Sequence, residues 1–315
     1  MISVIILTKN EERDLPGCLN SVCWSDDVYV YDSGSTDRTT AIAKNYGADV
    51  VIRPGGNGSE IFRGNEAEHK NWALKNIPFR HPWVLQLDAD ERVTPELAES
   101  MQQAVRNSSD FAAYRIRRRD YWGDRWLKHV VASSYYLRLF RPNMMHYERL
   151  INPVSVPDGP VGDISGFLDH FPFSKGVADW LKRHNSYSSL EAEQISRNRA
   201  ANQPFSLKSA FLASDPNERR FHQKELFYRM PFRPILKFAV FYLGKRGFLD
   251  GTEGFQYAVL QSFYEYMIVL KSRELAKKPN LVIRTERTEL NPEKDIQVIS
   301  ETRNTDSVIS GATHR

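Results

Sequence analysis

Trp83-Val84-Leu85-Gln86-Leu87-Asp88-Ala89-Asp90-Glu91 is a largely apolar run that stops at two carboxylates one residue apart. This pattern predicts a buried strand that delivers Asp88 and Asp90 to the carboxyl end of a sheet, where α/β proteins bind ligands. Two such acids offer the oxygen ligands that Mg²⁺ or Mn²⁺ takes, and they leave coordination positions for phosphate oxygens. The alternative is an acidic cap for a helix beginning near Thr94-Pro95. The stretch alone favours neither reading, and the rest of the chain decides.

The composition is that of an ordinary globular protein of 315 residues, 41% hydrophobic and 26% charged. The length allows one large domain or a domain with an appendage. Cys18 and Cys23 are expected to be core residues of one helix, and their spacing suits neither a disulfide framework nor a zinc site. Because Met1 leads directly into an apolar strand, and no apolar stretch is long enough to span a membrane, we expect a cytoplasmic protein.

The net charge of +4 is small, but the basic residues gather in two segments, Arg115–Lys128 and Arg219–Arg246. Such clusters suit anionic partners such as sugar diphosphates, phospholipid head groups or nucleic acid. Solvated basic faces are the alternative.

Strand and helix patterns alternate through the first hundred residues. Strands are predicted at Val4–Leu7, Val28–Tyr31, Ala48–Ile52 and Trp83–Leu87. Helices are predicted at Leu15–Val22, Ser35–Gly47 and Asn65–Asn76, and a Gly-rich loop at Pro54–Gly58. This rhythm predicts the α/β class, with a mostly parallel, Rossmann-like twisted sheet flanked by helices.

The second half has a different character. Strands are predicted at Ala112–Arg118 and Tyr135–Phe140, loops at Pro153–Gly166, and a long helix at Val177–Asn198. Residues after Pro279 are polar and poor in aromatic side chains, so we expect them to be disordered. The expected organisation is a nucleotide-binding half over 1–110, an acceptor-binding half over 111–200, a helical aromatic and basic extension over 201–276 and a tail over 277–315.

Polar loops follow the first two predicted strands. Thr8-Lys9-Asn10-Glu11-Glu12 follows the first, and Asp32-Ser33-Gly34-Ser35-Thr36-Asp37 follows the second. Asp32 can accept the imide N–H of a uracil, while Thr8 and Glu11 can reach the base or the ribose hydroxyls. Lys70, on the helix before the acidic strand, is a candidate for the diphosphate. The alternatives are an ordinary helix cap at Ser35-Thr36-Asp37 and an exposed helix lysine.

Together these two loops and Leu87-Asp88-Ala89-Asp90-Glu91 resemble family 2 inverting glycosyltransferases with the GT-A fold, in the branch of lipopolysaccharide-core β-1,4-glucosyltransferases. The resemblance is strong over 1–110 and looser as far as Gly251. It implies a GT-A domain with a helical C-terminal extension. It also implies transfer of a sugar from a nucleotide-diphosphate donor, expected to be a UDP-sugar, to a saccharide or lipid-linked acceptor in cell-surface polysaccharide or lipopolysaccharide synthesis.

The resemblance also assigns roles to residues. Thr8, Glu11 and Asp32 would hold the nucleotide, Lys70 and Asp88 would contact the donor, and Asp88 and Asp90 would bind Mg²⁺ or Mn²⁺. The catalytic base of this branch is the Glu of a His-Glu pair, and here Tyr147-Glu148 stands in the matching stretch. Glu148 is therefore the expected base, taking a proton from the acceptor hydroxyl as that oxygen displaces the diphosphate once, with inversion. Asp90 or Glu91 is the alternative base only if Glu148 faces away. His170, His184 and Tyr187 are weaker candidates for the acceptor pocket, packed or solvent-facing side chains being the alternative.

The segment Pro231–Lys271 interleaves aromatic and basic residues. This mixture is typical of a helix lying at an anionic membrane surface, so a peripheral contact with the cytoplasmic face of the inner membrane is expected. An amphipathic helix pair packed on the catalytic domain is the alternative.

Two other function classes remain to be weighed. A nucleotidyltransferase would carry a Gly-rich phosphate loop after the first strand, where this chain has Thr8-Lys9-Asn10-Glu11. A nucleic-acid-binding module would need a helix-turn-helix or zinc pattern, which the basic clusters lack, so no nucleic-acid partner is expected.

Overall fold

The first half of the chain forms four parallel strands, as predicted. The computed structural model describes residues 1–54, 66–107, 110–148, 153–200, 205–214 and 216–277. The strands are β1 (Ser3–Thr8), β2 (Val28–Asp32), β3 (Asp49–Ile52) and β4 (Val84–Asp88), and they lie side by side in the order β3-β2-β1-β4. The predicted Gly-rich loop after Pro54 and the predicted disordered tail after Pro279 lie outside the described residues.

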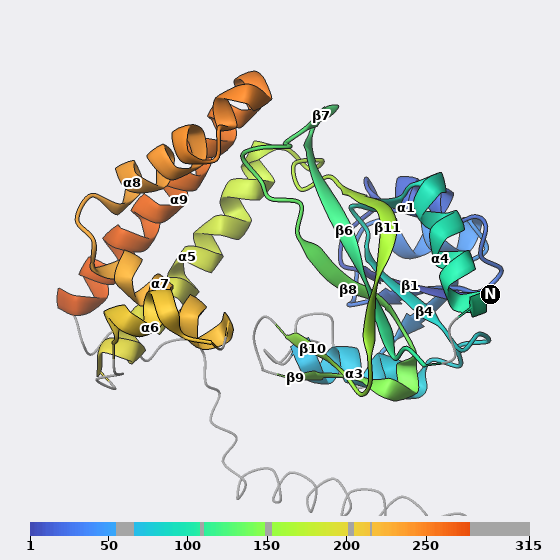
Figure 1. Cartoon of the computed structure of the whole chain (residues 1–315). Coiled ribbons are helices and arrows are strands. Elements are labelled where there is room, and N and C mark those ends of the chain that lie inside the picture. Colours follow the sequence, from blue (N-terminus) through green and yellow to red (C-terminus); the bar gives the residue numbers. More distant parts are fainter. Residues whose placement is uncertain (55–65, 108–109, 149–152, 201–204, 215, 278–315) are drawn as a thin grey trace, which may run out of the picture.

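Helices cover both faces of these strands because each strand alternates its side chains between two cores. The helices are α1 (Leu15–Ser21), α2 (Thr39–Asn45), α3 (Glu66–Asn76) and α4 (Pro95–Asn107). Val4 and Ile6 of β1 pack in one core with side chains of α1, α2 and α4. Ile5 packs in the other core with side chains of α3. Figure 1 shows α1 and α4 on one side of the sheet and α3 on the other.

Two local predictions in this half need correction. The second helix begins at Thr39 rather than Ser35, because the carboxylate of Asp37 accepts the Thr39 N–H and so ends the preceding loop. Cys18 is buried but Cys23 is exposed, because α1 ends at Ser21 and Cys23 lies beyond it; both cysteines are free. The acidic-cap alternative for Asp88-Ala89-Asp90 is also excluded, since the Thr94 hydroxyl accepts the Leu97 N–H at 3.2 Å and caps α4 itself.

The second half extends the sheet with strands of both directions. These are β5 (Glu91–Val93), β6 (Ala113–Trp122), β7 (Arg125–Trp126), β8 (Tyr135–Phe140) and β11 (Val161–His170), and the order continues from β4 as β8-β6-β11-β5, with β7 beside β6. β8 runs antiparallel to β4 and to β6, so the whole sheet is mixed. A separate pair is formed by β9 (Met145–Glu148), after η1 (Pro142–Met144), and β10 (Val154–Pro157).

The loop predicted for Pro153–Gly166 is wrong, since β10 and most of β11 occupy it. A glycine in this segment allows a bulge in the strand. The register of β11 on β6 shifts between Ile164 and Phe167, and Gly166 there has φ +97° with its Cα facing the backbone of Leu97. A side chain at this position would meet that backbone at about 3 Å, so only glycine fits the bulge.

A helical region follows the sheet. It consists of α5 (Val177–Ala200), α6 (Leu207–Leu212), α7 (Pro216–Arg229), α8 (Arg233–Ala239), the π-helix η2 (Val240–Gly244), the 3₁₀ turn η3 (Gly247–Asp250) and α9 (Gly251–Lys277). In Figure 1, α5 leads away from the sheet, and α8 and α9 lie beside it as a helical arm. Among the described residues, no helix is both long and apolar enough to cross a membrane.

Candidate active site

The carboxyl ends of β1, β2 and β4 meet at one edge of the sheet. The register places Thr8 of β1 beside Asp32 of β2, and Leu7 beside Asp88 of β4. Three of the residues singled out from the sequence are therefore brought together, because parallel neighbouring strands end at a common edge.

Asp32 organises the loop that follows β2. Its carboxylate is fully buried and accepts hydrogen bonds from the Thr8 hydroxyl at 2.9 Å and from the N–H groups of Gly34 and Ser35 at 2.9 and 2.7 Å. The Ser35 hydroxyl is a fourth donor. The negative charge thus holds the backbone at the strand end, while direct contact of Asp32 with a nucleotide remains a prediction.

Glu11 lies at the end of β1 under a loop from the second half of the chain. Lys175 places its Nζ 2.6 Å from Glu11 Oε1 and 2.9 Å from the carbonyl of Asn10. Burial raises the pKa of Glu11 to about 7, although the Lys175 ammonium opposes that shift. Among the described residues nothing donates to Glu11 Oε2, which is itself buried. Glu11 is thus a partly buried carboxyl whose Oε2, unpaired among the described residues, is left for a donor such as a hydroxyl.

Asp88 is paired with an arginine that the sequence did not single out. Arg138 of β8 donates from one guanidinium nitrogen to Asp88 Oδ2 and to Glu91 Oε1, each at 2.6 Å. Glu91 is fully buried and also accepts the backbone N–H of Asp88 at 3.0 Å. Burial alone would raise the pKa of Asp88, but the Arg138 guanidinium holds that pKa below its ordinary value. Asp88 is therefore an ionised carboxylate on a fixed backbone.

Asp90 is paired with a histidine. His170, at the end of β11, lies with Nε2 3.4 Å from Asp90 Oδ2 and with Nδ1 against the carboxylate of Asp120. Burial lowers the pKa of His170, but the two carboxylates outweigh it and raise that pKa to about 9. Burial likewise opposes ionisation of Asp90, yet contact with His170 holds its pKa at about 2. The imidazole is a largely buried cation between two carboxylates, next to Asp90, and its part in an acceptor pocket stays a prediction.

Lys70 of α3 reaches the same region. It lies 5.1 Å above the ring of Tyr147, whose hydroxyl donates to Gln86 of β4 at 2.6 Å. Burial lowers the pKa of Lys70, and the charge of Asp88 opposes that shift. Lys70 and Arg138 thus bring positive charge to the end of β4.

Glu148 is not brought to these carboxylates. Its side chain is exposed and pairs with His146 at 3.2 Å. The neighbouring side chain, Tyr147, is buried against β4, and strand alternation therefore turns His146 and Glu148 to the opposite side of β9. Residues 149–152, which follow, lie outside the described chain.

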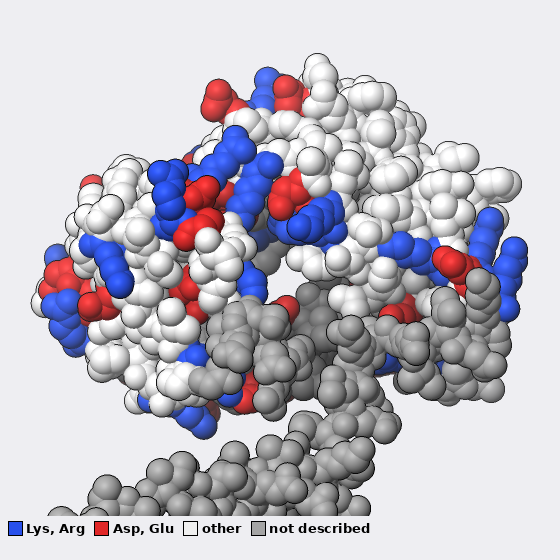
Figure 2. Space-filling view, turned by 180° about the vertical axis from the view of Figure 1, so that it is seen from behind, with Lys and Arg blue, Asp and Glu red and all other residues white. Residues whose placement is uncertain are grey.

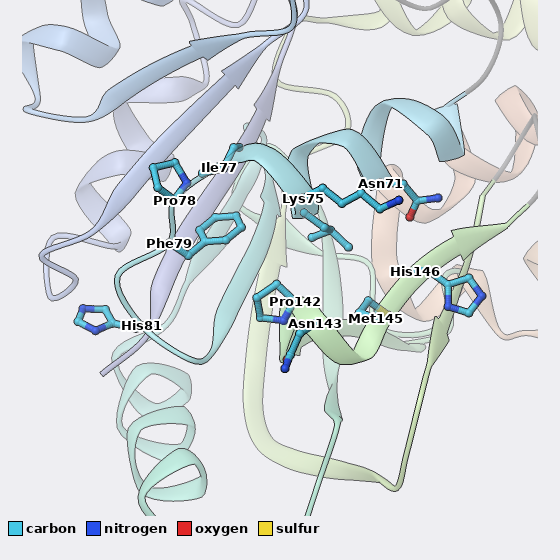
Figure 3. A pocket seen from close by; sticks show the side chains of 11 residues that line it. Asn71, Lys75, Ile77, Pro78, Phe79, His81, Pro142, Asn143, Met145 and His146 are labelled. Atoms are coloured by element: carbon cyan, nitrogen blue, oxygen red, sulfur yellow. The ribbon is translucent and has the colours of Figure 1, made fainter.

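A pocket of about 580 Å³ adjoins β9 (Figure 3). His146 and Met145 line one end of it, and Phe79 and His81 line the other. Because Phe79 and His81 lead into the amino end of β4, this pocket lies away from the strand ends that carry Thr8, Asp32 and Asp88.

The carboxylate oxygens at this sheet edge fit a divalent cation whose remaining ligands would be phosphate oxygens of a substrate. Within the described residues, no group of three or more His, Cys, Asp or Glu side chains is arranged to hold a metal ion. Mg²⁺ does not need one, since it is commonly held by one or two carboxylates, substrate phosphates and water. Asp88 and Asp90 are both ionised hard-oxygen donors at the sheet edge.

The weaker candidates His184 and Tyr187 lie on α5 and stack with other rings. His184 packs on Trp180 with ring centroids 3.5 Å apart, and Tyr187 meets the edge of His184. His184 is thus a packed side chain, whereas Tyr187 is 48% exposed.

Comparison with known proteins identifies the family of the chain. The model of the family described as Glycosyl transferase family 2 matches residues 3–167, slightly more than half of the chain. The lipopolysaccharide core biosynthesis glycosyltransferase LpsC of Rhizobium meliloti is 28% identical over 89% of this chain and 96% of its own length. An uncharacterised glycosyltransferase of Rickettsia typhi is 27% identical over 90% of each chain.

Solved structures give more distant likenesses. TarS of S. aureus covers 82% of this chain and 54% of its own, with a TM-score of 0.39 and 14% identity. Glucosyl-3-phosphoglycerate synthase of Mycobacterium tuberculosis, in complex with Mn²⁺, UDP and glucosyl-3-phosphoglycerate, covers 39% of this chain and 45% of its own, with a TM-score of 0.31 and 23% identity. With its GT-A arrangement of a mixed sheet, flanking helices and a C-terminal helical region, and with the family model spanning residues 3–167, the chain belongs to glycosyl transferase family 2.

Proposed function

We propose that this glycosyltransferase moves a sugar from a UDP-sugar, with Mg²⁺ or Mn²⁺, to a saccharide or lipid-linked saccharide acceptor and inverts the anomeric configuration. The observation that carries the proposal is the sheet edge itself. Ionised Asp88 and Asp90 lie there with the cations Arg138, His170 and Lys70, next to the loops that carry Glu11 and Asp32.

Each residue has a proposed part in the reaction. Thr8, Glu11 and Asp32 shape the nucleotide site, and Oε2 of Glu11, which has no partner among the described residues, accepts a hydroxyl of the donor. Lys70 offsets negative charge on the diphosphate. A divalent cation held by Asp88 and Asp90 would supply Lewis-acid stabilisation of the leaving diphosphate, typically several kcal/mol.

Glu148 is the proposed base. A base for an incoming hydroxyl has to be reachable from solvent, and the exposed Glu148 meets that requirement. Glu91 is fully buried beneath Arg138, and Asp90 is held by His170, so neither neighbouring acid is available. Removal of the acceptor proton by Glu148 from the face opposite the diphosphate gives a single displacement and therefore inversion.

The name of the Rhizobium meliloti relative points to the acceptor class. We propose that the acceptor is a saccharide of the lipopolysaccharide core or a related surface polysaccharide. Such an acceptor is anchored in lipid, so the enzyme would work in the cytoplasm at the inner membrane surface.

The test is a product assay. The purified chain is incubated with UDP-sugars, Mn²⁺ or Mg²⁺ and a delipidated core oligosaccharide, and the released nucleotide and the new glycosidic bond are identified. We expect free UDP and a bond of inverted configuration from one donor. Release of pyrophosphate would instead indicate a nucleotidyltransferase, and retention of configuration would overturn the proposed mechanism.

A further inference from the structure

The arm formed by α8, η2, η3 and α9 exposes large apolar side chains that the catalytic site does not use. On α8 and η2 they occur every three or four residues, at Phe232, Ile235, Leu236, Val240 and Leu243. Phe232, Ile235 and Leu243 are 75%, 66% and 62% exposed, well beyond what a packed helix pair leaves to solvent. Phe232 also has φ +53°, a strained conformation for an aromatic residue. Strain that keeps a large apolar side chain in solvent suggests a role for it there.

A second stripe runs along α9. It consists of Phe255, Val259, Phe263, Tyr266 and Leu270, all exposed. The opposite side of α9, with Gly254, Ala258 and Ile268, is buried. The ring of Phe255 packs against those of Phe238 and Tyr242, on α8 and η2, at 5.9 and 5.5 Å, so the second stripe borders the α8–η2 segment. Seen from behind, the arm presents a broad surface with almost no charged side chains (Figure 2). We call these two stripes the apolar face.

Cations gather where α8 and α9 meet, at the tip of the arm. Lys245 and Arg246 are exposed beside the exposed Phe248 and Leu249. Arg125 and Lys128 of the catalytic domain are exposed nearby, and Arg125 lies 3.4 Å from the carbonyl of Leu249. Of the acids there, Asp250 is buried and turned inward to His129 and Val130, whereas Asp124 is exposed and Glu253 is half-buried, so the four cations outnumber the accessible acids. The tip therefore presents positive charge and apolar side chains together.

Cations also mark the other end of the apolar face. A pocket of about 620 Å³ lies between α5, α8 and α9, lined by Phe232, Ile235 and Tyr266 of the face and by Arg199 and Arg273. Both arginines are exposed. The buried hydroxyl of Ser272, also in its wall, has no hydrogen-bond partner among the described residues. This end again combines apolar side chains with positive charge.

We propose that the apolar face and the cations at its two ends dock on an anionic phospholipid bilayer. Exposed aromatic and aliphatic side chains would enter the boundary between head groups and acyl chains, and the cations would meet the lipid phosphates. The proposal rests on the membrane-bound acceptor of the proposed function and identifies the surface and the lipid charge. Because Asp250 ties the tip to His129 and Val130, docking would fix the catalytic domain relative to the bilayer.

A second copy of the chain fits this face less well. A two-fold dimer brings each patch against itself or against its symmetry partner. Whether two arms aligned in the same or in opposite directions, a basic end of one arm would face a basic end of the other. Like charges that face each other in an interface weaken binding. An anionic surface instead complements both ends at once.

The experiment is sedimentation of the full chain with vesicles, without any sugar donor or acceptor. Vesicles of phosphatidylcholine are compared with vesicles containing phosphatidylglycerol, at low and high salt. We expect binding to the anionic vesicles that weakens with salt. The variant Lys128→Glu/Lys245→Glu should bind the anionic vesicles at least about 30-fold more weakly, because each lysine near an anionic membrane surface contributes roughly a five- to sixfold gain in affinity. The matched control Lys44→Glu/Lys75→Glu makes the same charge change on exposed lysines of α2 and α3 and should bind within about 3-fold of the unchanged protein.

A second variant tests the apolar contribution. Leu243→Ser/Leu249→Ser alters only exposed side chains, so it should fold normally while losing at least about 10-fold in binding. The proposed surface would be overturned if Lys44→Glu/Lys75→Glu lost as much vesicle binding as Lys128→Glu/Lys245→Glu. Unchanged vesicle binding of both Lys128→Glu/Lys245→Glu and Leu243→Ser/Leu249→Ser would overturn it as well. Absence of vesicle binding together with concentration-dependent dimerisation would assign the face to a second copy instead. Transfer to the delipidated acceptor is measured separately, so a failed vesicle experiment leaves the proposed function standing, and the reverse also holds.

Discussion

Arg138 reaches from β8 to the end of β4 and places one guanidinium nitrogen 2.6 Å from Asp88 Oδ2 and 2.6 Å from Glu91 Oε1. The pairing depends on the mixed sheet, because β8, a strand from the second half of the chain, lies antiparallel beside β4 and brings Arg138 to the sheet edge that carries Asp88. One arginine thus links the motif acid Asp88 to a buried acid that fixes the Asp88 backbone.

Removing this arginine should therefore destabilise the protein. Arg138→Met leaves the fully buried Glu91 without its main partner, and breaking a buried pair in this way costs about 3–5 kcal/mol. Arg115→Met is the matched control, since the Arg115–Asp163 pair on the same sheet is about half exposed and such pairs contribute ~0–1 kcal/mol. Urea unfolding measures both. Adding Glu91→Gln to Arg138→Met should restore part of the loss, and equal losses for the two arginines would contradict the assignment.

Asp90 should control metal-dependent binding of the nucleotide. Asp90→Ala removes an ionised carboxylate. We expect the affinity for UDP in the presence of Mn²⁺ to fall at least about 10-fold, because losing a side chain that supports a metal site lowers metal affinity by about that factor. Titration calorimetry of UDP with Mn²⁺ and with chelator gives the difference. In Asp163→Ala, which alters an exposed acid of β11, the Mn²⁺ dependence should persist. If Asp90→Ala keeps it as well, the metal lies elsewhere.

The base assignment makes a kinetic prediction. Glu148→Gln should lower kcat by about 10²–10⁴-fold with little change in the KM for the donor, because the proton acceptor is lost and the nucleotide site is untouched. His146→Gln breaks the 3.2 Å contact with Glu148 but keeps the carboxylate, so it should lower kcat far less. Full turnover by Glu148→Gln would remove it from the mechanism.

Much of this site could be predicted because it depends on strand ends. Thr8, Asp32 and Asp88 each end an apolar strand of a βαβ pattern, and neighbouring parallel strands end at one edge. The partners of the acids could not be predicted in this way. Arg138 and His170 lie in β8 and β11, and their positions depend on which distant strand inserts next to β4 and β6.

A signal for these partners was nevertheless present. Arg138 lies in a strand whose neighbours Leu139 and Phe140 are fully buried, and a buried arginine needs a carboxylate. β11 was missed for a different reason. Gly162 and Gly166 indicated a loop, whereas Gly162 lies close to the ring of Tyr114 and Gly166 forms a bulge over Leu97.

Burial of His69 should make stability pH-dependent. His69 lies on α3 between the hydroxyls of Tyr31 and Ser33, and burial lowers its pKa from 6.5 to about 4. The unfolded chain therefore binds a proton before the folded chain does, so stability is full above pH 6.5 and falls as the pH drops toward 4. From about pH 7.5 to 5.5 the loss should be about 1–2 kcal/mol by denaturant unfolding. His69→Gln should lack this component, and an identical pH profile in the variant would contradict the assignment.

Asp250 should hold the helical arm to the catalytic domain. Its carboxylate accepts the N–H groups of His129 and Val130 at 2.9 and 2.7 Å, so Asp250→Ala leaves two backbone donors without a partner. We expect a loss of about 2–6 kcal/mol in unfolding free energy, because each of the two unsatisfied donors costs about 1–3 kcal/mol. Glu274→Ala removes an exposed acid of α9 as a control and should change stability by less than about 0.5 kcal/mol. Limited proteolysis should cut Asp250→Ala faster between α8 and α9 than the control. Equal cleavage would mean that other contacts, such as those of α5 with α9, position the arm.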